Sequence, residues 1–108
     1  MILTGKLAEG ENTGWIDIKV PKRAVSAEIT LYWSRDWSMY PTSDLDLIVY
    51  WDEGYNYDGA TLNSPERVIL GNPTTLSVLI DGYSIYAGNE PYVLIIKFTL
   101  KFSGFGIR

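Results

Sequence analysis

Residues 43–51, Ser-Asp-Leu-Asp-Leu-Ile-Val-Tyr-Trp, alternate between polar and apolar side chains. One face of an extended segment here would carry large apolar side chains: Leu45, Leu47, Val49 and Trp51. The opposite face would carry Asp44, Asp46, Ile48 and Tyr50. A period of two residues is that of a β-strand with one buried face, and it restricts the chain to folds that bury one side of a sheet.

The same period recurs along the chain, whereas the 3.6-residue period of a helix does not. Further strands are predicted at residues 2–7, 15–20, 27–33, 67–70, 75–81 and 92–102. The intervening segments, including 34–43 and 52–59, are predicted to be loops. Short strands separated by Gly, Pro, Asn and Asp are typical of an antiparallel β-sandwich or jelly roll, and we expect this all-β fold in a single domain over residues 1–108.

The pattern also predicts which side chains form the core. Between the sheets we expect Ile16, Ile18, Leu31, Leu45, Leu47, Val78, Ile80, Leu94 and Ile96. Residues 92–96 are apolar on both faces, which predicts a central strand that is covered on both sides. The tail, residues 103–108, is predicted to be a frayed end or the beginning of a linker.

Composition excludes several function classes. The chain has no histidine and no cysteine, so a self-contained Ser-His-Asp hydrolase, a thiol nucleophile and a thiolate metal site are all excluded. We therefore expect a non-catalytic domain. A net charge of −4 argues against nucleic acid as a partner. No apolar run approaches the roughly 18 residues of a membrane span, so no membrane insertion is expected.

Acidic residues concentrate in the middle of the sequence. Between Asp36 and Glu66 there is no lysine or arginine, and an oxygen-rich, cation-poor segment can bind a hard cation such as Ca²⁺. The candidate ligands are Asp44, Asp46, Asp52, Glu53 and Asp58. The segment is not an EF-hand, because Tyr57 stands where that loop needs glycine and Asn63 where it needs glutamate. The alternative is that these acids are solvated surface groups in polar turns.

Aromatic residues crowd into the same region. Trp33 and Trp51 fall in register with the apolar positions and are expected in the core. Four others fall on the predicted loops: Trp37, Tyr40, Tyr55 and Tyr57. They could form a platform that stacks sugar rings or binds a protein chain, or they could pack over the open end of the sandwich.

Five segments together resemble a known family. They are residues 15–20, 29–34, the Asp-Leu-Asp-Leu of 44–47, the Ser-Pro-Glu of 64–66 and the Tyr-x-Leu-x-Ile of 92–96. In this order they are similar to the bacterial pre-peptidase C-terminal domain, a small β-sandwich or jelly roll found beside the catalytic domains of secreted peptidases. The chain departs from the family between Gly82 and Pro91, where the usual short glycine-bearing turn is replaced by a longer segment.

The resemblance implies an accessory domain of a secreted, subtilisin-like serine protease. Its partner would be the catalytic domain of the same parent chain, and its role would be to stabilise the parent or to help it engage protein or polysaccharide substrate. Calcium in related modules supports the proposed cation. We expect a monomer. The alternative function is a carbohydrate-binding module that uses the loop aromatics.

Overall fold

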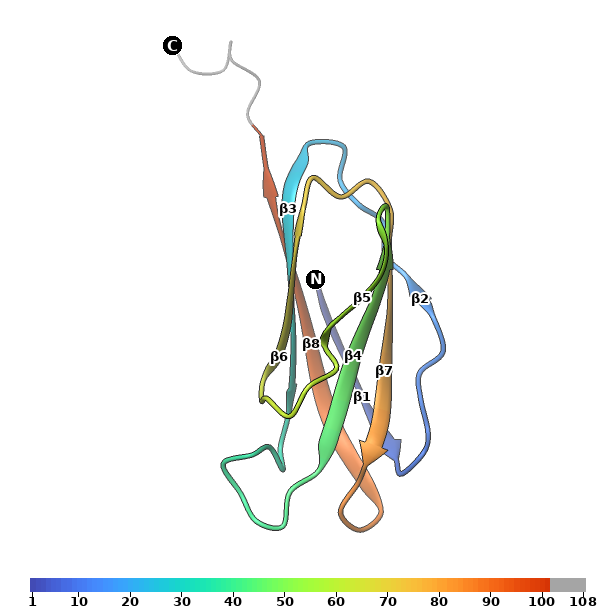
Figure 1. Ribbon diagram of the computed structural model, residues 1–108, viewed down its shortest axis with the longest axis vertical. Helices are drawn as coiled ribbons and strands as arrows, with labels where there is room; N and C mark the ends of the chain where they lie inside the picture. The colour runs from blue at the N-terminus through green and yellow to red at the C-terminus, as the bar shows by residue number, and fades with distance from the viewer. Residues whose placement is uncertain (102–108) are drawn as a thin grey trace.

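Two four-stranded antiparallel sheets pack face to face in the computed structural model, which describes residues 1–101 (Figure 1). The first sheet has the strand order β1 (Ile2–Ala8), β8 (Asn89–Leu100), β3 (Ala24–Trp33), β6 (Glu66–Gly71). The second has the order β2 (Ile16–Asp17), β7 (Leu76–Ser84), β4 (Asp44–Trp51), β5 (Gly54–Gly59). The expected antiparallel β-sandwich is confirmed.

The core lies between the sheets, where the alternating apolar residues of both sheets meet. Its most deeply buried side chains include Ile29, Leu31, Leu45, Leu47, Ile80, Leu94 and Ile96. The predicted core is confirmed, except that Ile16 and Trp51 are only partly buried and pack against the core from the short edge strand β2 and from the end of β4. Burying each such side chain contributes roughly 1.5–3 kcal/mol, so the alternation gives the fold its main driving force.

The prediction of a loop over residues 52–59 is wrong. A tight turn at Asp52 and Glu53 leads into β5, with Trp51 opposite Gly54 in the hairpin. Gly54 has a φ of 104°, which a residue with a side chain rarely adopts. The sequence shows no clear apolar alternation here, because β5 is an edge strand with a largely exposed, polar and aromatic outer face.

Two other strands differ from the sequence pattern. Only Ile16 and Asp17 pair in the segment predicted as a strand over residues 15–20. β8 is an interior strand of its sheet, as expected, but its outer face is not covered: Val93 is 37% exposed and Ile95 is only partly buried. The predicted tail, residues 103–108, lies outside the described residues, as does position 102 of the predicted last strand.

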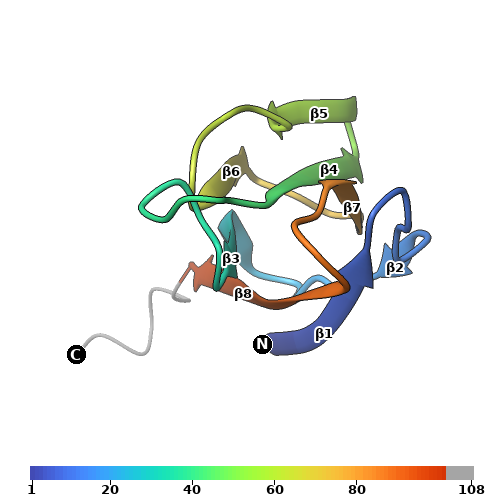
Figure 2. The same ribbon diagram turned by 90° about the horizontal axis from the view of Figure 1, so that it is seen from below.

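At one edge of the sandwich, the last strand of the first sheet contacts the second sheet directly. There β6 of the first sheet contacts β4 and β5 of the second. Figure 2, a view from below, shows β6 beside β4 with the loops that follow β3 and β5 around them. No helix within residues 1–101 has the length and apolar character required to cross a bilayer.

Candidate metal centre

Three carboxylates meet at this edge of the sandwich. Asp44, Asp46 and Glu66 each offer one oxygen, and these oxygens lie within 4.8 Å of one another. Asp44 and Glu66 are buried, and Asp46 is partly buried. The three residues are called the acidic cluster below.

The start of β4 places two of the three carboxylates. Asp44 pairs with Ser84 of β7, whereas Asp46 pairs with Asp81, so one extra residue of β7 is accommodated between them. Such a bulge bends a strand and redirects its side chains. The two aspartates therefore reach the edge of the sandwich from a strand whose next apolar residues, Leu45 and Leu47, fill the core.

The third carboxylate comes from the other sheet. Glu66 is the first residue of β6, opposite Leu31 of β3, and only 1% of it is exposed. Its carboxylate accepts hydrogen bonds from the Thr61 backbone N–H at 3.0 Å and from the Thr61 hydroxyl at 2.7 Å. The loop after β5 therefore orients Glu66 toward the start of β4.

The loop before β4 is held in place by buried hydrogen bonds. The Trp33 indole N–H donates to the carbonyl of Ser43 at 2.9 Å, and the Ser43 N–H donates to the carbonyl of Arg35 at 2.8 Å. The Ser43 hydroxyl accepts the N–H of Tyr86 at 3.0 Å. Ser43 is fully buried, so the residue next to Asp44 is fixed from both sides.

Asp44 has one carboxylate oxygen that no group within residues 1–101 satisfies. The residue is 6% exposed, and its Oδ1 is buried without a hydrogen-bond partner in that part of the chain. A buried polar atom of this kind costs about 1–3 kcal/mol, and more when it is charged. No ion pair of the described residues involves the acidic cluster, so nothing in that part of the chain neutralises it.

The pKa values reflect this environment. Burial raises the pKa of Asp44. Burial, followed by the negative charges of Asp44 and Asp81, raises the pKa of Asp46 to about 6. Burial raises the pKa of Glu66 to about 7, with the charges of Asp46 and Asp44 adding to the effect and the Thr61 hydrogen bonds opposing it. The cluster therefore favours either protons or a bound cation.

The spacing suits calcium. Calcium binds oxygen at about 2.3–2.6 Å, so two oxygens on one ion lie at most about 5 Å apart. The oxygens of the acidic cluster meet this limit, and carboxylate oxygens are the ligands that a hard cation prefers. One ion could therefore contact one oxygen of each of the three residues.

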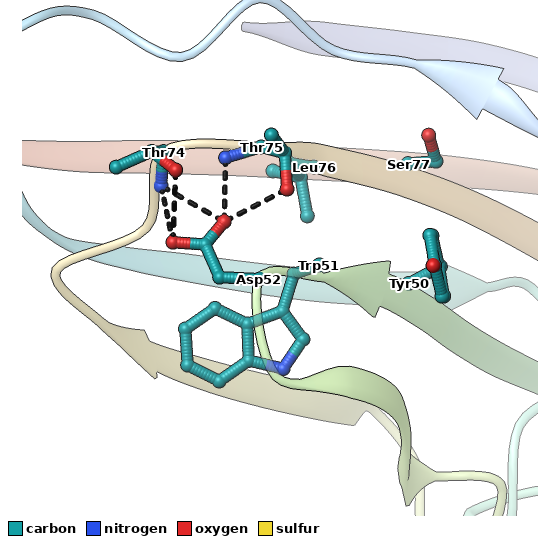
Figure 3. A pocket seen from close by; sticks show the side chains of 7 residues that line it. All are labelled: Tyr50, Trp51, Asp52, Thr74, Thr75, Leu76 and Ser77. Carbon is teal, nitrogen blue, oxygen red and sulfur yellow. Dashed lines mark hydrogen bonds between the residues drawn. The ribbon is translucent and has the colours of Figure 1, made fainter.

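Asp52, another predicted ligand, lies at the opposite end of β4. Its carboxylate accepts hydrogen bonds from the backbone N–H and hydroxyl groups of Thr74 and Thr75, at 2.7–3.2 Å (Figure 3). These bonds lower its pKa to about 2, with those from Thr75 contributing most. Asp52 therefore joins the β4–β5 turn to the loop before β7.

Glu53 and Asp58 also lie outside the acidic cluster. Glu53 follows Asp52 in the exposed turn. Asp58 lies on β5, where its N–H donates to the Asn56 side chain at 2.9 Å in a local turn-like contact. The structure thus brings together two of the five predicted ligands, Asp44 and Asp46, and adds Glu66.

Glu66 is the cluster residue that sequence reasoning missed as a ligand. It was visible as the last residue of the Ser-Pro-Glu motif, but a motif gives no distance between residues 20 positions apart. The pairing of β6 with β3 and the contact of β6 with β4 supply that proximity. A single glutamate in a polar segment also gives no sign that it will be buried next to Thr61.

The four predicted loop aromatics do not form one platform. Trp37 and Tyr40 lie on the loop after β3, and Tyr40 is 95% exposed. Tyr55 and Tyr57 instead lie on the strand β5, where their rings stack with centroids 6.2 Å apart. The expectation that all four lie on loops is therefore wrong for the second pair.

No family model matches this chain, and no curated protein matches it.

Proposed function

We propose that this chain is a non-catalytic accessory domain of a secreted, subtilisin-like protease and that a calcium ion at the acidic cluster stabilises its fold. The observation that carries the calcium proposal is a cluster of three buried or partly buried carboxylates, of which Asp44 also has an Oδ1 without a hydrogen-bond partner among residues 1–101. The accessory role is supported by the β-sandwich fold and by the five segments that resemble the pre-peptidase C-terminal domain.

A cation at this position would stabilise the sandwich by joining its two sheets. Asp44 and Asp46 belong to the second sheet and Glu66 to the first. Because the ligands come from both sheets, binding selects the folded state. The expected gain is RT ln(1 + [L]/Kd), or about 2.7 kcal/mol when free calcium exceeds Kd a hundredfold.

The calcium proposal is tested by thermal unfolding at neutral pH. We expect the melting temperature to rise with added calcium and to fall with a chelator. Asp44→Asn should abolish this response, whereas Asp58→Asn, a matched change at an exposed carboxylate outside the cluster, should retain it. An unchanged melting temperature with chelator and with calcium would contradict the proposal.

The accessory role needs a different experiment. We expect the gene of the parent protein to encode a subtilisin-like catalytic domain on the N-terminal side of this domain. Deleting the domain from that parent should then shorten the half-life of protease activity at elevated temperature. A parent gene without a protease domain would rule out the accessory role while leaving the calcium site untouched.

We further expect no hydrolytic activity from the domain alone, because it has no histidine or cysteine to act as base or nucleophile. Peptide and glycoside substrates should both remain intact with the purified domain. Turnover that disappears in Asp46→Asn would show that the acidic cluster is catalytic.

A further inference from the structure

A strip of aromatic rings covers part of the outer face of the second sheet. Trp15 precedes β2, Tyr50 lies on β4, and Tyr55 and Tyr57 lie on β5. All four are 46–60% exposed. They are called the aromatic strip below.

The rings of the strip form a continuous chain of contacts. The centroids of Tyr50 and Tyr55 are 4.8 Å apart, and Trp15 lies 6.4 Å from Tyr50 and 5.9 Å from Tyr55. Tyr57 extends the strip beyond Tyr55. Mutual packing already restricts the rings, so these side chains lose little conformational freedom when a ligand stacks on them.

Strand pairing continues the strip into a polar surface. Tyr50 pairs with Tyr55 on one side and with Ser77 on the other, and Ser77 pairs with Asp17. The Ser77 hydroxyl donates to the Asp17 carboxylate at 2.7 Å. Directly paired residues point to the same face of a sheet, so rings, a hydroxyl and a carboxylate share one row across four strands, about 14 Å wide.

A hollow adjoins this row. It has a volume of about 490 Å³ and is lined by Tyr50, Trp51, Asp52, Thr74, Thr75, Leu76 and Ser77 (Figure 3). This volume is within the range of small-molecule sites, about 300–1,000 Å³. Tyr50 and Ser77 belong to both the row and the hollow, so a ligand on the rings can also reach hydroxyl and carboxylate oxygens.

We propose that the aromatic strip and the adjoining hollow bind a neutral polysaccharide. The flat face of a pyranose ring presents weakly positive C–H groups that complement the negative face of an aromatic ring. Its hydroxyl groups donate hydrogen bonds to oxygen acceptors such as those of Asp17 and Ser77. One sugar chain therefore matches both halves of the surface.

Charge complementarity excludes anionic polymers. The turn and strand that carry Tyr55 and Tyr57, residues 52–59, contain three exposed acidic residues, Asp52, Glu53 and Asp58, and no lysine or arginine. Nucleic acids, acidic polysaccharides and anionic membranes would be repelled. A basic polypeptide would be attracted by these charges, and its binding would be weakened by salt, whereas stacking of an uncharged polysaccharide on the rings would not.

The test is retention of the purified domain on microcrystalline cellulose and chitin, and retardation in native gels that contain soluble xylan, mannan or mixed-linkage glucan. We expect binding to at least one of these polymers that persists at high salt. Tyr55→Ala and Trp15→Ala should each weaken it at least about tenfold, as loss of one stacking ring does in other polymer-binding surfaces. Tyr40→Ala and Tyr83→Ala, which remove exposed rings outside the strip, should leave it unchanged.

Thermal unfolding of each variant shows whether a loss of binding results from a loss of fold. If one variant does not fold, Tyr57→Ala, at the end of the strip, takes its place. Asp44→Asn should bind normally, because the acidic cluster is a separate site. The proposal is overturned if none of the polymers binds, or if Tyr55→Ala and Trp15→Ala both bind as the unaltered domain does. Retention only by polylysine, released by salt, would overturn it in favour of a basic polypeptide.

Discussion

The two ends of strand β4 carry aspartates in opposite environments. Asp52, just beyond the end of the strand, is held by the N–H and hydroxyl groups of Thr74 and Thr75, and its pKa falls to about 2. Asp44, at the start of the strand, is buried with one oxygen unpartnered, and burial raises its pKa. The charged form of an aspartate is thus stabilised at one end of β4 and disfavoured at the other.

This difference shows how to separate structural acids from candidate ligands. A carboxylate whose oxygens accept several hydrogen bonds from its own chain has its charge stabilised internally. A buried carboxylate near two others, without a cation from the protein, costs stability unless something else binds there. Acidic residues close together in the sequence can therefore have unrelated roles.

The largest effect on stability is expected from a core substitution in β4, the strand that carries Asp44 at its start and is followed by Asp52. Leu47 is fully buried in the core, and Leu47→Ala should lower the free energy of unfolding by about 2–5 kcal/mol through lost burial and the cavity left behind. Urea unfolding would measure this loss. If calcium binds at the acidic cluster, the Leu47→Ala variant should still gain stability with calcium, because that cluster is intact. A variant as stable as the unaltered domain would contradict the core assignment.

The pH dependence of stability should have opposite signs at the two ends. In chelator, the raised pKa values of Asp46, from 3.8 to about 6, and of Glu66, from 4.5 to about 7, favour the folded state at low pH. This contribution is present below the ordinary pKa values and is lost as pH rises through about 6 and about 7. Thermal melting in chelator from pH 4 to 8 should show it.

Calcium should reverse that trend, because a carboxylate must be ionised to coordinate the ion. The stabilisation by calcium is expected to grow over the pH range in which the protein in chelator becomes less stable. A calcium effect equally large at pH 4 and pH 8 would argue against carboxylate ligands.

Replacing one carboxylate of the acidic cluster by an amide separates the effect of its charge from that of its hydrogen bonds. Glu66→Gln should raise the melting temperature in chelator at pH 7.5, because it removes a buried negative charge while keeping an oxygen that can accept from Thr61. It should also weaken calcium binding, so that at least about ten times more calcium is needed for the same rise in melting temperature. Glu53→Gln, on the exposed turn, is the matched control and should change neither property. A glutamine variant that is less stable in chelator would show that the charge of Glu66 is needed by the fold itself.

The smallest effect is expected at Asp52. In the unaltered domain its contribution is present above its ordinary pKa of 3.8 and is lost as pH falls through about 2. Asp52→Asn should therefore reduce the dependence of melting temperature on pH between 4 and 2, with a smaller loss of stability at pH 7 than Leu47→Ala. Its calcium response should be unchanged. Loss of that response would place Asp52 in the metal site after all.

Much of the fold could be predicted because local sequence and tertiary environment agree. The alternation of Leu45, Leu47 and Val49 allows only one face of β4 to enter the core, and the structure buries that face. The edge strands of the second sheet, β2 and β5, were harder to predict. β5 carries tyrosines and polar side chains outward, so its sequence resembles a loop, and its pairing with β4 decides its conformation.

The candidate sites were predictable only in part, for the same reason. Asp44 and Asp46 lie on one strand, and their spacing is fixed by the local backbone. Glu66 joins them because β6 of the other sheet begins beside β4, a contact between sheets that no local pattern encodes. The aromatic strip likewise combines Trp15 with Tyr50 and Tyr55, residues from three segments.

Residue types and a period of two were enough to establish the all-β class, the buried faces of β4 and β7, and the absence of histidine and cysteine chemistry. The packing of the two sheets sets which acids have hydrogen-bond partners, which acids share a site and which rings touch. Those properties depend on distances between strands that are far apart in the chain, and strand pairing sets these distances.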